Sequence, residues 1–292
     1  MNPKLHLTSV GDPQMVGEIV EGFRLGLCEL GYDVTWNYAQ IDAARVNIIM
    51  FGAASLKWKD LAHLAPNCIV VNIEQLVEGG NAFNPIYLEV LRNSYVWEYS
   101  ELNFRRYAEL GIPHASLVPL GYQAGAILAP PEAQAPPVED IDVLFFGSLN
   151  ARRHRLLDEM RERGLRVEAH HSIPAEERSA LLMRSKLMLN VSYLDTTRTV
   201  ELPRLAVGFV ARKAILTEIY DDSELRTELR QGLFGVPYEQ LVDTAERLIS
   251  TPEQLRERAD LGHQLFTAKS QASFIQPALK QFFAWRENQA AR

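Results

Sequence analysis

The chain has 292 residues, of which 47% are hydrophobic and 23% charged, and its 37 acidic and 30 basic side chains give a formal net charge of −7. This balance is typical of a soluble globular protein and argues against wholesale disorder or a fibrous repeat. The negative charge also argues against a general nucleic-acid-binding protein, because binding to phosphates requires clustered Lys and Arg. At about 100–200 residues per domain, the length predicts two domains.

The N-terminal segment is unlike a secretion signal. Its apolar stretch is broken by Lys4, His6 and Asp12, and no window of about 18 apolar residues is present, so we expect a cytoplasmic protein without a membrane span. Cys28 and Cys68 stand far from any CxxC spacing. We expect both to be small core residues rather than metal ligands or disulfide partners.

The first 125 residues alternate between strand-like and helix-like patterns. Strands are expected at 4–10, 33–37, 46–51, 68–74, 94–100 and 116–122, and helices at 15–31, 84–93 and 101–110. Gly31 and Gly111 are expected to end helices, and Ser100 to cap the start of one. Continuous apolar runs between helices are typical of parallel strands buried on both faces. The alternation predicts a doubly wound α/β domain.

A second domain with the same alternation is predicted over 138–270, after a semi-rigid linker at 124–138 that carries four prolines in two pairs. Its strands are expected at 141–148, 166–171, 186–193 and 213–218, and its helices at 152–163, 174–186, 200–211, 238–250 and 252–266. A last helix, within 271–292, carries apolar residues at helical spacing. We expect it to pack back onto the first domain.

Open α/β sheets bind ligands at the carboxyl ends of their strands, so two such domains predict a cleft between them as the functional site. Strand 141–148 ends in Gly147-Ser148, and Asn150, Arg152 and Arg153 then follow at the start of a helix. The free N–H groups of a helix N-terminus favour an anion, and two guanidiniums would complete a diphosphate clamp. The alternative is that both arginines simply face solvent, although cations there oppose the helix dipole.

A second polar cluster follows strand 186–193. Tyr193, Thr196 and Thr197 lie in the loop, and Glu201 opens the next helix. Either threonine is a possible cap for that helix. Glu201 is a candidate acceptor of hydrogen bonds from ribose hydroxyls, the role that an acidic residue has in dinucleotide folds. Its alternative role is to stabilise the helix dipole.

The order of these segments resembles a known architecture. FFGSLNARR, SYLDTTRTVELPRLAVGFVARKAILTE and YEQLVDTAERLISTPEQLRERADLG resemble the donor-binding half of GT-B glycosyltransferases. VVNIEQL, YLEVLRNSYVWEYSELNFRRYAELGI and SLVPLGY resemble the acceptor half of small bacterial glycosyltransferase-like proteins with the same layout. The resemblance covers nearly the whole chain and implies two Rossmann-like domains, 1–125 for the acceptor and 138–270 for the nucleotide-sugar donor.

The resemblance also implies roles for individual residues. Ser148, Asn150, Arg152 and Arg153 would hold the donor diphosphate, Glu201 would bind the ribose, and the loop with Tyr193, Thr196 and Thr197 would lie near the phosphate or sugar. One departure is plain: retaining members of the sucrose-synthase-like class carry paired glutamates seven or eight residues apart, and the position seven beyond Glu201 is Gly208. The stereochemical outcome is therefore left open.

An inverting transfer needs a general base beside the acceptor hydroxyl. Asp12, in the Gly11-Asp12-Pro13 turn after the first strand, is the first candidate, although Asp before Pro is also ordinary turn chemistry. Glu74 and Glu98 end strands and are second candidates, because burial can raise the pKa of a glutamate. His170, with His171, would line the cleft or contact the nucleobase.

The sequence thus predicts a metal-independent sugar transferase with no cofactor, since no grouping of His, Cys, Asp and Glu residues has a metal-ligand spacing. Its partners would be a nucleotide-diphosphate sugar and a hydroxyl-bearing acceptor, not a nucleic acid or a membrane. Surface polysaccharide, glycolipid or secondary-metabolite glycosylation are the settings considered. The alternatives are a nucleotide-sugar epimerase or hydrolase, a solute-binding protein, and a catalytically silent relative that binds nucleotide.

Overall fold

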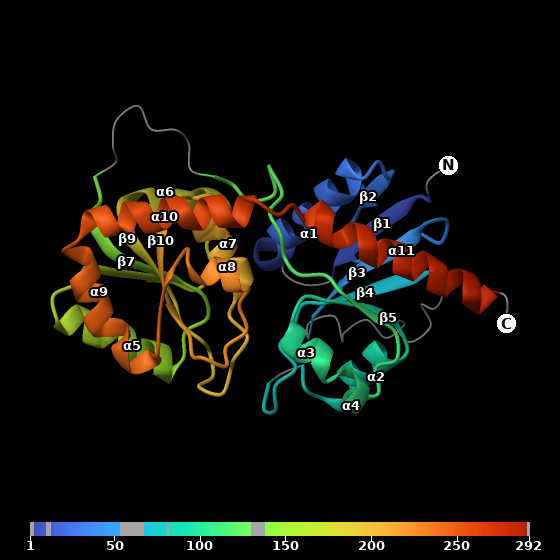
Figure 1. The fold of residues 1–292 in the computed structure, drawn as a ribbon, viewed down its shortest axis with the longest axis horizontal. Coiled ribbons are helices and arrows are strands. Elements are labelled where there is room, and N and C mark those ends of the chain that lie inside the picture. The colour runs from blue at the N-terminus through green and yellow to red at the C-terminus, as the bar shows by residue number, and fades with distance from the viewer. Residues whose placement is uncertain (1–2, 10–12, 53–66, 81, 130–137, 291–292) are drawn as a thin grey trace. The chain divides into compact units, whose positions relative to one another are not determined.

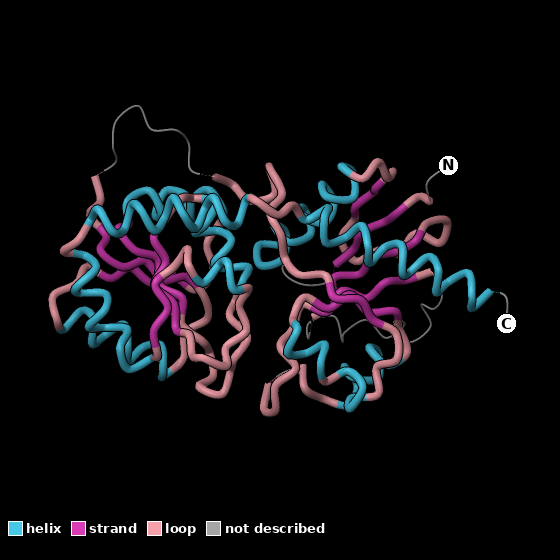
Figure 2. The backbone as a smooth tube through the Cα atoms, viewed as in Figure 1, coloured by secondary structure: helices cyan, strands magenta, loops and turns pink. Residues whose placement is uncertain are grey.

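The computed structural model describes residues 3–9, 13–52, 67–80, 82–129 and 138–290, and it divides the chain into two compact units (Figure 1). Unit 1 comprises Met1–Ala126 and Ser270–Arg292, and unit 2 comprises Ile127–Lys269. Within each unit, strands form a central sheet that helices cover on both sides (Figure 2). Both sheets are parallel throughout, which confirms the predicted doubly wound α/β class.

The described part of unit 1 contains a six-stranded sheet in the order β2-β1-β3-β4-β5-β6. Its strands are β1 (Leu5–Ser9), β2 (Val34–Trp36), β3 (Val46–Phe51), β4 (Cys68–Asn72), β5 (Tyr95–Glu98) and β6 (Ala115–Leu117). Its helices are α1 (Pro13–Glu29), α2 (Pro85–Arg92), α3 (Glu101–Arg105), α4 (Tyr107–Leu110) and α11 (Gln271–Ala290). The expected helix over 101–110 is thus two short helices that meet at Arg106.

Two hydrophobic cores, one on each face of the sheet, hold unit 1 together. Helices α1 and α11 cover one face, where Phe23 of α1 and Phe282 of α11 are buried with Trp97 of β5 (Figure 1). Helices α2 and α4 cover the other face, and Tyr87 and Tyr107 are buried there. The aromatic residues of the last helix therefore serve packing, since Phe274, Phe283 and Trp285 also pack against the first core.

Local signals in the sequence explain several helix ends in unit 1. The Ser100 side chain accepts a hydrogen bond from the Asn103 N–H and caps α3, and Gly111 ends α4 with φ +71°, a conformation that favours glycine. Gly31 follows α1 with φ +82°. Cys68 is buried as expected, whereas Cys28 lies on the exposed side of α1, so its assignment to the core was wrong.

Unit 2 contains a five-stranded sheet in the order β11-β10-β9-β7-β8 within its described residues. Its strands are β7 (Ile141–Phe146), β8 (Val167–His170), β9 (Ser185–Asn190), β10 (Ala214–Glu218) and β11 (Phe234–Val236). Its helices are α5 (Ala151–Glu162), α6 (Ala175–Arg184), α7 (Leu202–Val210), α8 (Thr227–Arg230), α9 (Leu241–Ile249) and α10 (Pro252–Thr267), with a 3₁₀ turn at Tyr238–Gln240. The sequence did not predict α8 or β11, since elements this short show no period.

The strand order of unit 2 defines where a ligand would bind. The chain leaves β7 to form β8 on one side and then returns to form β9 on the other side of β7. Consecutive connections therefore depart in opposite directions between β7 and β9, which is the topological switch point of the sheet. In open α/β sheets, ligands bind outside the carboxyl ends of the strands at this point.

Candidate functional site

Arg153 ties together the carboxyl ends of the two strands at the switch point of unit 2. Its guanidinium donates to the main-chain oxygen of Ser148, just after β7, at 2.7 Å and to that of Val191, just after β9, at 2.5 and 3.1 Å. The side chain is only 2% exposed. Asn150 caps the start of α5, because its side chain accepts a hydrogen bond from the main-chain N–H of Arg153 at 2.9 Å. The residue therefore fixes the strand ends and the helix start as one unit.

Glu201 holds Arg153 and a second buried arginine, Arg204. Its Oε1 lies 2.9 Å from Arg153 Nη2, and its Oε2 lies 2.5 Å from Arg204 Nη2. Arg204 also donates to the Asn190 side chain at the end of β9, at 2.7 Å. Burial lowers the pKa of Arg204 below its usual range, and the neighbouring Glu201 offsets part of that effect. Glu201 is the residue before α7 and makes no side-chain cap, so neither Thr196 nor Thr197 caps this helix.

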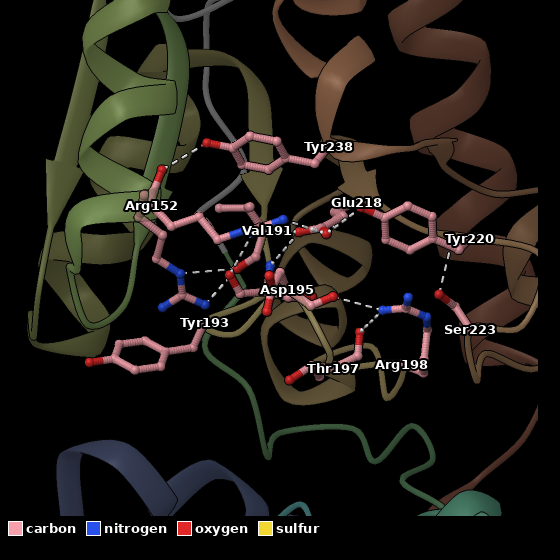
Figure 3. A network of polar contacts seen from close by, with 12 residues as sticks. Arg152, Val191, Tyr193, Asp195, Thr197, Arg198, Glu218, Tyr220, Ser223 and Tyr238 are labelled. Carbon is pink, nitrogen blue, oxygen red and sulfur yellow. Dashed lines mark hydrogen bonds and ion pairs between the residues drawn. The ribbon is translucent and has the colours of Figure 1, made fainter. Parts of the chain in front are cut away.

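Arg152 makes a separate ion pair with Glu218, the last residue of β10. Two guanidinium nitrogens donate to the carboxylate at 2.7 and 2.9 Å, and Nη1 also donates to Ser192 O at 3.0 Å. Burial is the largest single influence on the pKa of Arg152 and lowers it, but the hydrogen bonds to Glu218 and the charge of that carboxylate, with smaller contributions from Tyr238 and Tyr220, together raise it above its usual range. The guanidinium stacks on the Tyr238 ring at 3.9 Å, and Tyr238 Oη donates to Arg152 O (Figure 3).

Both arginines of the predicted diphosphate clamp make ion pairs within the chain. Cations in the first turn of α5 oppose the helix dipole, but here Glu201 and Glu218 supply the offsetting negative charge from within the chain. Arg153 is a buried bridging residue, and Arg152 keeps 17% of its side chain exposed. Three guanidiniums, including that of Arg204, against two carboxylates leave this cluster with one excess positive charge, which favours an anion nearby.

The loop after β9 presents one aromatic side chain to solvent. Tyr193 is 46% exposed, its ring centroid lies 5.4 Å from the Arg153 guanidinium, and its carbonyl oxygen accepts from Asn150 Nδ2 at 2.7 Å. Arg198 closes the loop by donating to the carbonyl oxygens of Asp195 and Thr197 (Figure 3). Thr197 is buried and Thr196 is exposed. Tyr193 and Thr196 are thus the predicted loop residues with surface available to a ligand.

His170, the remaining predicted donor-binding residue, ends β8. Its main-chain oxygen accepts from Gly147 N at 2.8 Å, and its Nε2 lies 3.4 Å from Glu168 Oε2. Its side chain is 26% exposed, so it borders the strand ends without a bond to the arginine cluster.

Sequence reasoning missed Arg204, Glu218 and Asn190. Glu218 closed a predicted strand, and Arg204 stood in a predicted helix, so their elements were known. Their partners were not, because Arg152 and Glu218 are 66 residues apart and Arg153 and Glu201 are 48 apart.

In unit 1, Glu98 at the end of β5 lies within a buried polar network. Its side chain accepts from Asn72 Nδ2 at 2.7 Å, Ser100 N at 2.8 Å, Asn103 Nδ2 at 3.2 Å and the Tyr107 hydroxyl. Burial raises the pKa of Glu98 to about 7, against the lowering effect of these hydrogen bonds. The residue is 0% exposed. It has no surface with which to contact an acceptor hydroxyl, so it joins β4, β5 and α3 rather than acting as a base.

The other two candidate bases are Glu74 and Asp12. Glu74 is partly exposed, and its main-chain oxygen accepts from the side chains of Asn72 and Asn103 just beyond the end of β4. Asp12 lies outside the described residues.

Across the described ranges, no helix is long and apolar enough to cross a membrane. The same residues contain no cluster of three or more His, Cys, Asp or Glu side chains that could hold a metal ion.

The fold belongs to a known class. Among solved structures, the chain is similar to sucrose-phosphate synthase from Thermosynechococcus elongatus, with a TM-score of 0.64, 13% identity and coverage of 100% of both chains. It is similar to Anabaena Alr3699/HepE in complex with UDP, with a TM-score of 0.58, 10% identity and coverage of 99% and 100%. These neighbours confirm the predicted GT-B glycosyltransferase fold.

A third structural neighbour is an α-glucosyltransferase solved with UDP and a 13-mer DNA containing an HMU base. It gives a TM-score of 0.61 at 10% identity and covers 97% of this chain and 100% of its own. No protein-family model matches the sequence. Among curated proteins, an uncharacterized protein, L140 of Acanthamoeba polyphaga mimivirus, is 25% identical over 199 residues, which span 66% of this chain and 62% of the viral protein.

Proposed function

We propose that the protein is a glycosyltransferase that moves a sugar from a nucleotide-diphosphate sugar, bound by unit 2, to a hydroxyl group of an acceptor bound by unit 1. The observation that carries this proposal is the Arg153–Glu201–Arg204 network at the switch point of unit 2, beside the N-terminus of α5. Two structural neighbours were solved with UDP, which makes a uridine diphosphate sugar the first donor to test.

In this proposal, the diphosphate lies at the start of α5. The N–H groups of the first helical turn, the Ser148–Asn150 segment and the excess charge of the cluster attract it. Arg152, the more exposed of the two neighbouring arginines, is the guanidinium that reaches the phosphates. These groups would stabilise the negative charge that develops on the departing diphosphate.

Glu201 binds the ribose. Each carboxylate oxygen accepts from one guanidinium, but a carboxylate offers about four lone-pair sites, so two remain for hydroxyl groups. Its 29% exposure leaves room for that contact. Arg153 and Arg204 then act as positioning residues, and Tyr193, Thr196 and His170 border the base or the sugar.

Asp12 is the general base for the acceptor hydroxyl, and the reaction needs no metal ion. The acceptor is a hydroxyl of a polysaccharide, glycolipid or secondary metabolite in the cytoplasm. The net charge of −7 favours such an acceptor over DNA, with which one structural neighbour was solved.

Titration calorimetry with UDP, GDP, dTDP and CMP tests donor binding. We expect UDP to bind and Glu201→Ala to weaken it about tenfold, whereas Glu239→Ala, an exposed carboxyl in the 3₁₀ turn, leaves it unchanged. Donor turnover with EDTA present tests metal independence. If none of the four nucleotides binds wild-type protein, the transferase proposal fails. Asp12→Asn should abolish acceptor-dependent turnover while UDP binding persists.

A further inference from the structure

Unit 2 carries a pocket built from residues other than those of the strand-end network. It is open, has a volume of about 370 Å³ and lies along the edge strand β11. Three arginines line it: Arg230 from the end of α8, Arg247 from α9 and Arg258 from α10. Its lining contains no aspartate or glutamate.

Two of these arginines are held in place by neutral groups. Arg258 Nη1 donates to the carbonyl oxygens of Gln231 and Leu233, both at 3.0 Å, and its guanidinium lies 4.7 Å from the centroid of the Phe234 ring. Arg230 donates to the carbonyl oxygens of Ser223 and Leu225. Carbonyl oxygens orient a guanidinium but do not cancel its charge, so both arginines remain net cations at the pocket.

The guanidinium of the third arginine, Arg247, has no hydrogen-bond or ion-pair partner within the described part of the chain. It is exposed and lies three residues after the pocket residue Thr244, on the same face of α9. Four of the five acidic side chains on α9 and α10 pair elsewhere: Asp243 and Glu246 with Arg163, Glu253 with Arg256 and Asp260 with Arg212. The fifth, Glu257, does not line the pocket.

Three uncompensated cations around one pocket repel one another, and the cost is removed when a multiply charged anion binds among them. Guanidiniums match phosphate oxygens with paired N–H donors, and the Thr244 hydroxyl adds a neutral donor. We infer that this pocket is a binding site for a small phosphate-bearing anion of about diphosphate size. The site is separate from the proposed donor site and does not depend on the proposed function.

Titration calorimetry of the full chain with inorganic pyrophosphate tests the inference. Wild-type protein should bind it saturably, and Arg247→Gln should weaken binding about tenfold. Arg247→Lys, which keeps the charge but loses the planar fork, should fall between the two. Arg256→Gln is the matched control, because Arg256 is an exposed arginine on α10 that does not line the pocket. Since Arg247 is exposed, its replacement should leave the melting temperature within about 1 °C of wild type.

Pyrophosphate could also enter the proposed donor site, so Glu201→Gln is titrated in parallel. A result in which Glu201→Gln weakens pyrophosphate binding and Arg247→Gln does not would overturn the inference. Equal losses of pyrophosphate affinity in Arg247→Gln and Arg256→Gln would also overturn it. So would the absence of saturable binding at 10 mM pyrophosphate, which is roughly the weakest affinity of interest. Sulfate binding as tightly as pyrophosphate would overturn it as well.

Discussion

The carboxylate of Glu201 pairs with two guanidiniums at once, those of Arg153 at 2.9 Å and Arg204 at 2.5 Å. Both arginines are more than nine-tenths buried, at 2% and 9% side-chain exposure. Removing this one negative charge would leave two buried cations facing each other, which is more costly than the loss of a surface ion pair.

Glu201→Gln should therefore lower the free energy of unfolding by about 2 kcal/mol. Urea denaturation at pH 7 measures the change. Glu253→Gln is the control, because it breaks an exposed pair with Arg256 and should cost less than about 0.5 kcal/mol. Equal stability of the two variants would contradict a central role for Glu201 in the network.

Gly147 lies against this network. Its φ of +145° is a conformation that favours glycine, and a Cβ at this position would lie 2.5 Å from Arg204 Nη2. Gly147→Ala should destabilise the protein by about 2 kcal/mol and weaken UDP binding, because Arg204 would have to move away from Glu201. Gly164→Ala, also at positive φ but with nothing within 4 Å of the added Cβ, should cost only the backbone strain.

A double-mutant cycle separates strain from displacement. In an Arg204→Met background, Gly147→Ala should cost at least about 0.5 kcal/mol less than in the wild type. Strictly additive losses would show that the alanine does not act through Arg204.

The sequence predicted the sheets and most helices of this chain because long apolar runs and helical spacing are local signals. β11 and α8, of three and four residues, carry no such signal. The arginines were predicted at the start of α5, where they are found, but their orientation depends on Glu201 and Glu218, which only the folded chain brings near. Glu98 was expected at a strand end with a raised pKa; its complete burial follows from α3 and α4 folding over it, which a strand pattern does not reveal.

The buried carboxyl of Glu98 makes the stability of the protein depend on pH. Burial raises its pKa from an ordinary 4.5 to about 7, so between these values the folded protein holds a proton that the unfolded chain has lost. The stabilisation from this group is full below pH 4.5 and is lost as the pH rises to about 7. At about 1.4 kcal/mol per unit of pKa difference, the loss is on the order of 3 kcal/mol.

Urea denaturation of wild type and Glu98→Gln from pH 5 to 8 checks this expectation. The glutamine cannot ionise, so the free energy of unfolding of the wild type should fall relative to that of the variant as the pH rises. Glu101→Gln, at a carboxyl 56% exposed on the following helix, should track the wild type. Parallel pH curves for wild type and Glu98→Gln would rule out titration of Glu98 in this range.

Tyr193 offers a test of ligand binding that leaves the fold intact. Its ring is 46% exposed beside the Arg153 guanidinium, so a base or sugar can stack on it at little cost to folding. Tyr193→Ala should weaken UDP-sugar binding about fivefold to tenfold, as the loss of roughly 1–1.4 kcal/mol of stacking implies, while the melting temperature stays near that of the wild type.

Tyr193→Phe keeps the ring and should bind within about twofold of the wild type. Tyr38→Ala, at a tyrosine 48% exposed in unit 1, controls for the loss of a surface ring. Calorimetric titration of the four proteins distinguishes the outcomes: undiminished affinity in Tyr193→Ala would remove this loop from the donor site, and equal weakening in Tyr193→Phe would assign the effect to the hydroxyl instead of the ring.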